Sequence, residues 1–194
     1  MADPANECFA LRREDGSLTG EIKPRALVHR DGDLHGASHV FLARLRGGRA
    51  ELLLQKRSAQ KDSFPGLYDI SAAGHPGEDF AAAARRELAE ELGVTGEEPE
   101  FLFAQRNEYH GAFHGKPFHD NEIAWVHLLV LDRPEEAFTP EACEVESCAP
   151  CGKTTCASAC ARRSSAVCCR IWHKSSAFRL TSSEAEGTIK VNRL

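Results

Sequence analysis

One stretch, Asp79–Leu92 (DFAAAARRELAEEL), constrains the fold most, because it has the pattern of an amphipathic helix with defined ends. Its apolar residues recur every four positions, at Phe80, Ala84, Leu88 and Leu92. That period gives a helix one apolar stripe for packing. Asp79 suits the N-cap, and Gly93 suits the position just after the last turn. The pattern therefore predicts a helix over 79–92 that packs on a core.

The same helix carries Glu87, Glu90 and Glu91, which share one face at i, i+3 and i+4. Like charges repel at that spacing, and a divalent cation reverses the repulsion. Mg²⁺ and Mn²⁺ prefer oxygen ligands and keep waters and substrate phosphates in their shell. Such an ion can activate water and neutralise a diphosphate. The alternative is a solvated face whose glutamates pair with Arg85 and Arg86.

The apolar runs around this helix predict strands. Val40–Leu45 and Glu51–Leu54 flank Gly47-Gly48 as a β-hairpin, and the polar stretch 57–66 is a loop. Residues 1–20 read as a short strand or arm. Further strands are expected at Leu67–Ala73, Phe101–Asn107 and Ile123–Leu131, the last apolar on both faces and hence central. Strands before and after one helix predict an α+β fold.

The whole-chain composition narrows the class of protein. A chain of 194 residues with 42% hydrophobic residues is one domain, or one domain with an appendage. A net charge of −5 gives no sign of nucleic-acid binding. No apolar run is long enough to span a membrane, and the N-terminus lacks a signal pattern, so we expect a cytoplasmic protein. Nothing in the sequence excludes a homodimer.

The stretch Gly74–Val94 resembles the Nudix box, G-x5-E-x7-R-E-U-x-E-E-x-G-U with U aliphatic. From Glu78 onward every defined position matches. The resemblance implies a Nudix fold, an α/β/α sandwich with a mixed sheet and a catalytic loop-helix-loop, within residues 1–146. It also implies a Mg²⁺- or Mn²⁺-dependent attack on a small-molecule diphosphate. Carried over by position, the metal ligands are Glu87, Glu90 and Glu91, with Arg86 holding the helix and its glutamates in place, and Glu78 either pairs with Arg86 or joins the metal site.

One departure from the box is the spacing between Gly74 and Glu78. Three residues, His75 to Gly77, separate them, whereas the pattern has five. The glycine-rich bend, whose backbone would approach phosphate oxygens at Gly74, is thus two residues short. That removes up to roughly 7 Å of reach.

Outside the box, 52–76 and 118–128 resemble the branch containing type I isopentenyl-diphosphate isomerase and its hydrolase-like relatives. The isomerase binds a metal through histidines and two acids. The matching positions are His29, His35, His75, Asp120 and Glu122. Alternatively, His29, His35 and His39 are solvated loop histidines, and the two acids are strand-edge charges.

The isomerase also needs a cysteine before G-H-P for proton transfer, and this chain has Ala73. We therefore favour hydrolysis of an organic or nucleoside diphosphate, with Glu90, Glu91 or Glu122 as general base. Arg57 and Lys61 would contact the diphosphate, or are ordinary surface charges. The alternatives are the isomerase itself and a non-catalytic Nudix-fold binding module.

The composition changes abruptly after residue 146. The segment 147–194 has eight Lys or Arg residues against two Asp or Glu, and no sustained period. Three explanations compete. Cys148, Cys151, Cys156 and Cys160 form a zinc site; or the basic segment is a nucleic-acid arm; or the reading frame has slipped near codon 147. We favour the frame slip, which predicts a tail without native-like packing.

Overall fold

The computed structural model describes residues 7–47, 49–77, 79–140, 145–151, 178–183 and 188–193. Within them the strands are β1 Cys8–Arg12, β2 Leu18–Pro24, β3 His35–Arg46, β4 Arg49–Arg57, β5 Tyr68–Asp69, β6 Ala72–Gly74, β7 Glu100–Phe113, β8 Lys116–Val130, β9 Val145–Cys151, β10 Phe178–Ser183 and β11 Thr188–Arg193. The helices are α1 Arg25–Asp31, α2 Phe80–Leu92 and the 3-10 turn η1 Glu135–Ala137. The fold is therefore α+β, as the sequence predicted.

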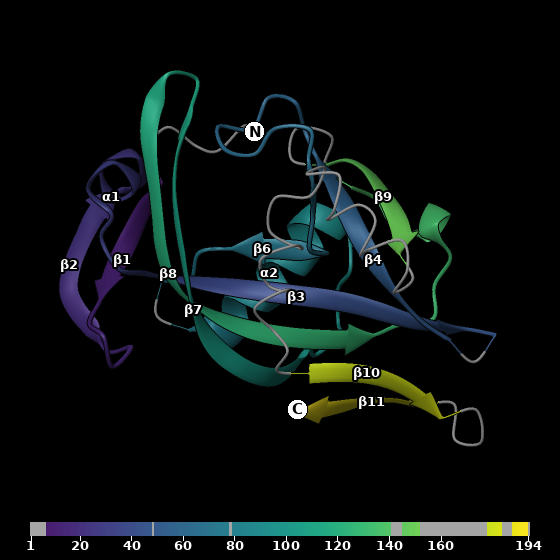
Figure 1. The fold of residues 1–194 in the computed structure, drawn as a ribbon. Coiled ribbons are helices and arrows are strands. Elements are labelled where there is room, and N and C mark those ends of the chain that lie inside the picture. Colours follow the sequence, from purple (N-terminus) through teal and green to yellow (C-terminus); the bar gives the residue numbers. More distant parts are fainter. Residues whose placement is uncertain are drawn as a thin grey trace.

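Strand β3 organises the sheet (Figure 1). Its partner β8 runs parallel along one edge, from the pair His35–Glu122 onward. Its other edge pairs antiparallel, first with β6 and then with β4. Strands β5 and β9 extend the sheet beyond β4, and β7 extends it beyond β8. The sheet is mixed, as expected, and the predicted central place of the strand ending near residue 131 is confirmed.

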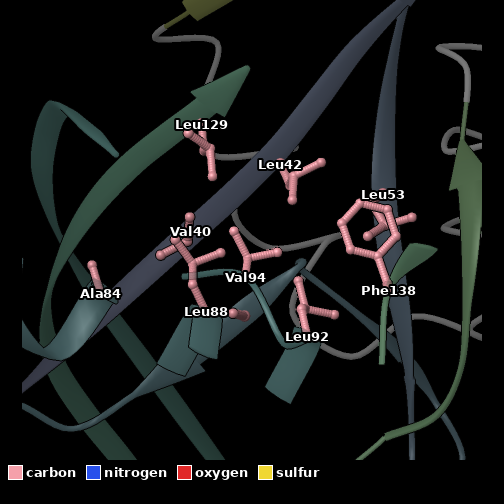
Figure 2. Packing of buried hydrophobic residues seen from close by; sticks show 10 residues of the cluster. Val40, Leu42, Leu53, Ala84, Leu88, Leu92, Val94, Leu129 and Phe138 are labelled. Atoms are coloured by element: carbon pink, nitrogen blue, oxygen red, sulfur yellow. The ribbon is translucent and has the colours of Figure 1, made fainter. Parts of the chain in front are cut away.

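Two hydrophobic clusters fill the two faces of β3. Figure 2 shows the first, where Leu88 and Leu92 of α2 meet Val40 and Leu42 of β3. The second gathers Phe41 and other buried residues of neighbouring strands on the opposite face. Since β3 is buried on both faces, its side chains cannot be solvated loop residues, and His35 and His39 within it are buried too.

Helix α2 has the ends that the sequence predicted. The Asp79 carboxylate accepts hydrogen bonds from the N–H groups of Ala81 and Ala82, which caps the first turn. Gly93 takes φ 67° and ends the helix in the left-handed region, which suits glycine. The predicted apolar stripe is confirmed, because all four of its residues are buried.

Three elements differ from the sequence prediction. The strand expected over Leu67–Ala73 is two short strands, β5 and β6, which pair with β4 and β3 respectively. Helix α1 was not predicted. The strands expected at Phe101–Asn107 and Ile123–Leu131 belong to one long antiparallel hairpin that turns at His114-Gly115. Both turn residues have positive φ, as a two-residue type I′ turn requires.

The segment after residue 146 begins in the sheet. Strand β9 pairs with β4 as far as Cys151. Two of the four proposed zinc ligands, Cys156 and Cys160, lie outside the described residues, so the three explanations for the tail stay predictions. Among the helices in the described part of the chain, none has the length and apolar character that crossing a membrane requires.

Candidate active site

A pocket of about 230 Å³ opens where α2 and β6 meet the face of the β7–β8 hairpin that carries Asn107 and Asp120. Its described lining comes from widely separated parts of the sequence. On one side are Glu87, Glu90, Arg86 and Gly74, which together with the buried Glu91 of the same helix we call the helix side. Facing groups include His29 and His75, which together with buried His35 we call the histidine side. Cation-binding groups thus come from several separate elements: helices α1 and α2, strand β3 and the segment after β6.

The three box glutamates take different positions. Glu87 and Glu90 line the pocket, whereas Glu91 is not among the lining residues. Glu91 is buried and accepts hydrogen bonds at Oε2 from Gln55 Nε2 and from the Ala73 N–H, both at 3.1 Å. In the described structure these three carboxylates do not form a group whose ligand atoms all lie within 4.8 Å of one another. The helix side is therefore an open arrangement of oxygens.

Burial changes the ionisation of two of these groups. Removal from water raises the pKa of Glu87 to about 7, opposed by Arg86 and reinforced by Glu90. Burial also raises the pKa of Glu91 to about 8, and the nearby Glu87 reinforces the shift. Both carboxyl groups therefore hold protons more firmly than a solvated glutamate. A bound cation would compete with those protons.

Arg86 connects the helix to the bend before it. Its guanidinium lies 2.7 Å from Glu87 Oε1 and donates to Glu90 Oε2 at 3.0 Å. It also donates to the carbonyl of His75 at 3.3 Å. Arg86 therefore contacts both pocket glutamates and the bend that precedes their helix.

Gly74 permits the close approach of Glu87 to β6. A Cβ built at Gly74 would lie 1.7 Å from Glu87 Oε1 and 2.6 Å from Glu87 Cγ. Any side chain at position 74 would therefore displace the Glu87 carboxylate. The glycine is required at this position by space, since its backbone conformation is not in the left-handed region.

The histidine side brings His29 of α1, His35 of β3 and His75 together. One ring nitrogen from each lies within 4.8 Å of the others, and His35, Asp120 and Glu122 form a second such group. Phe9 packs against all three rings, with its centroid 3.9 Å from that of His75. The five positions that match the isomerase are thus adjacent in space, joined through His35.

The electrostatics on this side are uneven. Burial lowers the pKa of His29 to about 2, helped by the charge of Arg25. Burial also opposes charge on His35, but Asp120, 3.5 Å from its Nε2, raises the pKa of that imidazole overall. Burial and Arg25 lower the pKa of His75. His29 and His75 are therefore neutral imidazoles with nitrogen lone pairs that can bind a metal.

Behind these groups lies a buried ion pair. His39 Nε2 is 3.2 Å from Glu122 Oε1, and Asn107 Nδ2 donates to the same oxygen at 2.8 Å. Burial alone would raise the pKa of Glu122, but the nearby His39 and His35 hold it far below its usual range. Glu122 therefore stays ionised in the pocket wall.

Three basic side chains also line the pocket: Arg25, Arg57 and Lys61. Arg57 donates to the Ser63 carbonyl and lies 3.3 Å from Asp69 Oδ2. Arg25 lies 3.1 Å from Glu7 Oε2. Lys61 is buried, and its charge opposes the rise in the pKa of Glu91. The surface-charge alternative for Arg57 and Lys61 is disfavoured, since both face the pocket.

Sequence reasoning missed several lining residues, and one expected residue lies outside the described part of the chain. Glu78, expected as a metal ligand, is outside it. Asn107 and Arg25 gave no local signal; register alone places Asn107 opposite Glu122. Ala73 lines the pocket where the isomerase has its cysteine. Neither Cys8 nor Cys148 is among the lining residues.

Fold and pocket together define an α+β protein with oxygen and imidazole ligands beside basic groups. The family model of the NUDIX domain matches residues 35–152. The chain therefore belongs to the Nudix family.

Known relatives include both enzymes suggested by the sequence. The chain is 42% identical over 151 residues to Nudix hydrolase 3 of Arabidopsis thaliana, a match covering 74% of this chain and 19% of that protein. It is 31% identical over 150 residues to isopentenyl-diphosphate Delta-isomerase 1 of Aromatoleum aromaticum, covering 63% and 82%. The chain thus spans about a fifth of the Arabidopsis relative and most of the Aromatoleum one.

Solved structures support the fold. The crystal structure of DR0079 from Deinococcus radiodurans is similar with a TM-score of 0.61 at 18% identity, covering 83% of this chain and 93% of that one. A Nudix hydrolase from M. smegmatis, RenU, is similar with a TM-score of 0.52 at 16% identity, covering 85% and 90%. The expected Nudix fold is confirmed.

Proposed function

We propose that this chain is a metal-dependent hydrolase of a diphosphate linkage in a nucleoside diphosphate derivative or another organic diphosphate. The observation that carries the proposal is the pocket composition. One cavity is lined both by the carboxylates of Glu87 and Glu90 and by the basic side chains of Arg57 and Lys61. The carboxylates can bind a divalent metal ion, and the basic side chains can bind the diphosphate whose charge that ion neutralises.

The donor chemistry of the helix side fits Mg²⁺ or Mn²⁺. Nudix hydrolases generally use such ions, and hard cations prefer the oxygen ligands that Glu87, Glu90 and Glu91 offer. When bound, the ion would activate a water and neutralise diphosphate charge. Glu91 would need to turn from Gln55 and Ala73 to reach it, whereas Glu87 and Glu90 already face the pocket.

The other residues would bind and orient the substrate. Arg57, braced by Asp69 and the Ser63 carbonyl, presents a fixed cation toward the diphosphate. Arg86 pairs with both Glu87 and Glu90 and would hold the two carboxylates in place. For the general base, Glu90 and Glu122 both line the pocket, and Glu122 is ionised there.

The test is product analysis by mass spectrometry with Mg²⁺ or Mn²⁺ over a panel of diphosphates: ADP-ribose, nucleoside triphosphates, NADH, coenzyme A and isopentenyl diphosphate. We expect cleavage by the wild type and none by Glu90→Gln. Glu98→Gln is the matched control, since Glu98 pairs with Arg85 on the exposed surface. No cleavage by a folded wild type across the panel would contradict the proposal and favour the non-catalytic binding module.

A second candidate function is isopentenyl-diphosphate isomerisation, favoured by the assembled histidine side and by the Aromatoleum relative. Ala73 argues against it, because alanine has no proton to give to an alkene. NMR of isopentenyl diphosphate incubated with the protein would detect the isomer. Isomer formation by the wild type would make this candidate the better one.

A further inference from the structure

A second cluster of ligand-type side chains lies on the back of the β7–β8 hairpin. It consists of Glu108, His110 and His119. Side chains alternate between the two faces of a strand. Asn107 and Asp120 line the pocket, so their neighbours Glu108 and His119 face away from it. None of the three lines the pocket.

The hairpin register brings the cluster together. Glu108 and His110 are two apart on β7 and share a face, and His110 pairs directly with His119 of β8. Their ring centroids are 3.6 Å apart. Each Nε2 atom lies 3.2 Å from the same oxygen, Glu108 Oε1. Two nitrogens and one carboxylate oxygen therefore converge from two strands.

These separations suit one small cation. Zinc takes imidazole nitrogen and carboxylate oxygen at about 2.0–2.2 Å in a tetrahedral shell, which places bound atoms about 3.3 Å from one another. The two 3.2 Å separations already match that spacing. An ion at this position would replace the protons that the imidazoles now share with Glu108.

The end of α1 supports one of the rings. Gly32 ends α1 at φ 74°, and a Cβ there would lie 2.1 Å from His119 Nδ1, so only glycine leaves room for this ring position. Beside it, Asn121 Nδ2 donates to the Gly32 carbonyl at 2.9 Å. The more exposed His110 and Glu108 leave the outer side open to water, which can complete a four-coordinate shell.

We propose that Glu108, His110 and His119 form a binding site for a divalent transition metal, with Zn²⁺ as the probe of choice. Imidazole suits Zn²⁺, Cu²⁺ and Ni²⁺, whereas Mg²⁺ prefers the all-oxygen helix side of the pocket. The site is separate from the proposed hydrolytic centre and does not depend on it.

The first measurement is Zn²⁺ titration by calorimetry on the full chain in excess Mg²⁺. A His29→Asn background weakens the histidine side of the pocket, which also offers imidazoles. We expect His110→Ala and Glu108→Gln to weaken the remaining Zn²⁺ site at least about tenfold, since losing even an outer partner of a metal site costs about 10- to 100-fold. His114→Ala, at the tip of the same hairpin, is the matched control and should bind like its background.

A second measurement locates the ion without changing the protein. Substoichiometric Cu²⁺ should broaden the ring proton signals of His110 and His119 in NMR spectra and spare those of His114. Unchanged Zn²⁺ affinity in His110→Ala and Glu108→Gln would overturn the proposal, and so would Cu²⁺ broadening that spares His110 and His119.

Discussion

The helix side and the histidine side of the pocket both offer cation ligands, but they are prepared in opposite ways. On the helix side, burial raises the pKa of Glu87 and Glu91, so the carboxyl groups keep protons until a cation displaces them. On the histidine side, burial lowers the pKa of His29 and His75, so those imidazoles are already neutral ligands. The difference teaches that burial favours the neutral form of each group. For a carboxyl group the neutral form carries a proton where the metal would bind, whereas for an imidazole the neutral form has a free lone pair for the metal. We therefore expect the two sides to prefer different metals and to respond differently to pH.

The largest effect should come from removing a pocket carboxylate on the helix side. Glu87→Gln keeps the size of the side chain but removes the charge that would hold Mg²⁺. Because metal stabilisation of a transition state is worth several kcal/mol, we expect Mg²⁺-dependent kcat/KM to fall roughly 10³-fold. Steady-state kinetics on the substrate found in the panel would measure it. A fall of less than tenfold would show that the helix side does not carry the metal chemistry.

A smaller loss should follow from displacing the same carboxylate without removing it. In Gly74→Ala the new methyl group takes the space of Glu87 Oε1. Misplacing a catalytic group by about 1 Å can cost on the order of 100-fold, so we expect a loss of roughly 10- to 100-fold in kcat/KM. Gly77→Ala, where an added Cβ meets nothing within 4 Å, is the matched control. Equal activity in the two variants would show that Glu87 has freedom to move.

The histidine side should matter more for transition metals than for Mg²⁺. His29→Asn removes one of its three rings, so we expect Zn²⁺ affinity at the pocket to fall by about tenfold or more. Mg²⁺-dependent turnover should fall by less than Glu87→Gln lowers it. Calorimetry and kinetics on the same variant would measure both. If Mg²⁺-dependent turnover fell as far as in Glu87→Gln, the two sides would act as one site, and the expected difference in their metal preference would be wrong.

The smallest effect is a pH dependence of stability in the presence of EDTA. The folded-state pKa values of Glu87 and Glu91, about 7 and about 8, lie above the ordinary glutamate value. The folded state therefore binds more protons than the unfolded state, and the stability this gives is lost as pH rises through those values. From about pH 7 to about pH 8.5 we expect the free energy of unfolding to fall by about 1–2 kcal/mol.

Urea unfolding with EDTA would measure this fall, and added Mg²⁺ should reduce it. Glu91→Gln should flatten the profile, because the residue with the larger shift no longer titrates. The pKa of His39 is also raised in the folded state, so its deprotonation lowers the free energy of unfolding as pH rises, in the wild type and in Glu91→Gln alike. A wild-type profile that rises over this range would show that the two glutamates are already ionised without metal.

The parts of this molecule that sequence could predict are those set by local patterns. Helix α2 was predicted at both ends, because its cap, its stripe and its terminal glycine all lie within 15 residues. Helix α1 was missed, since it is seven residues long and follows Pro24 without a side-chain cap. The outer half of the β7–β8 hairpin was missed because its polar residues obscure the alternation and His114 is an unusual residue at positive φ.

The pocket was predictable only as far as the family resemblance reached. That resemblance gave the histidines and acids, and the parallel pairing of β3 with β8 explains their proximity, since it sets His35 beside Glu122. No local pattern could indicate Arg25 or Asn107, which reach the pocket through tertiary packing and strand register. The same holds for Gln55, whose bond to Glu91 joins residues 36 positions apart.

The alternation of the β7–β8 hairpin also limits how this segment can vary in length. Asp120 and His119 are neighbours in the sequence but face opposite sides of the sheet. One codon inserted between them would turn every residue on the tip side of β8 to the other face. His119 would then point toward the pocket and Phe118 away from it. Insertions and deletions that preserve the pocket should therefore come in steps of two residues in this segment, or be confined to the turn.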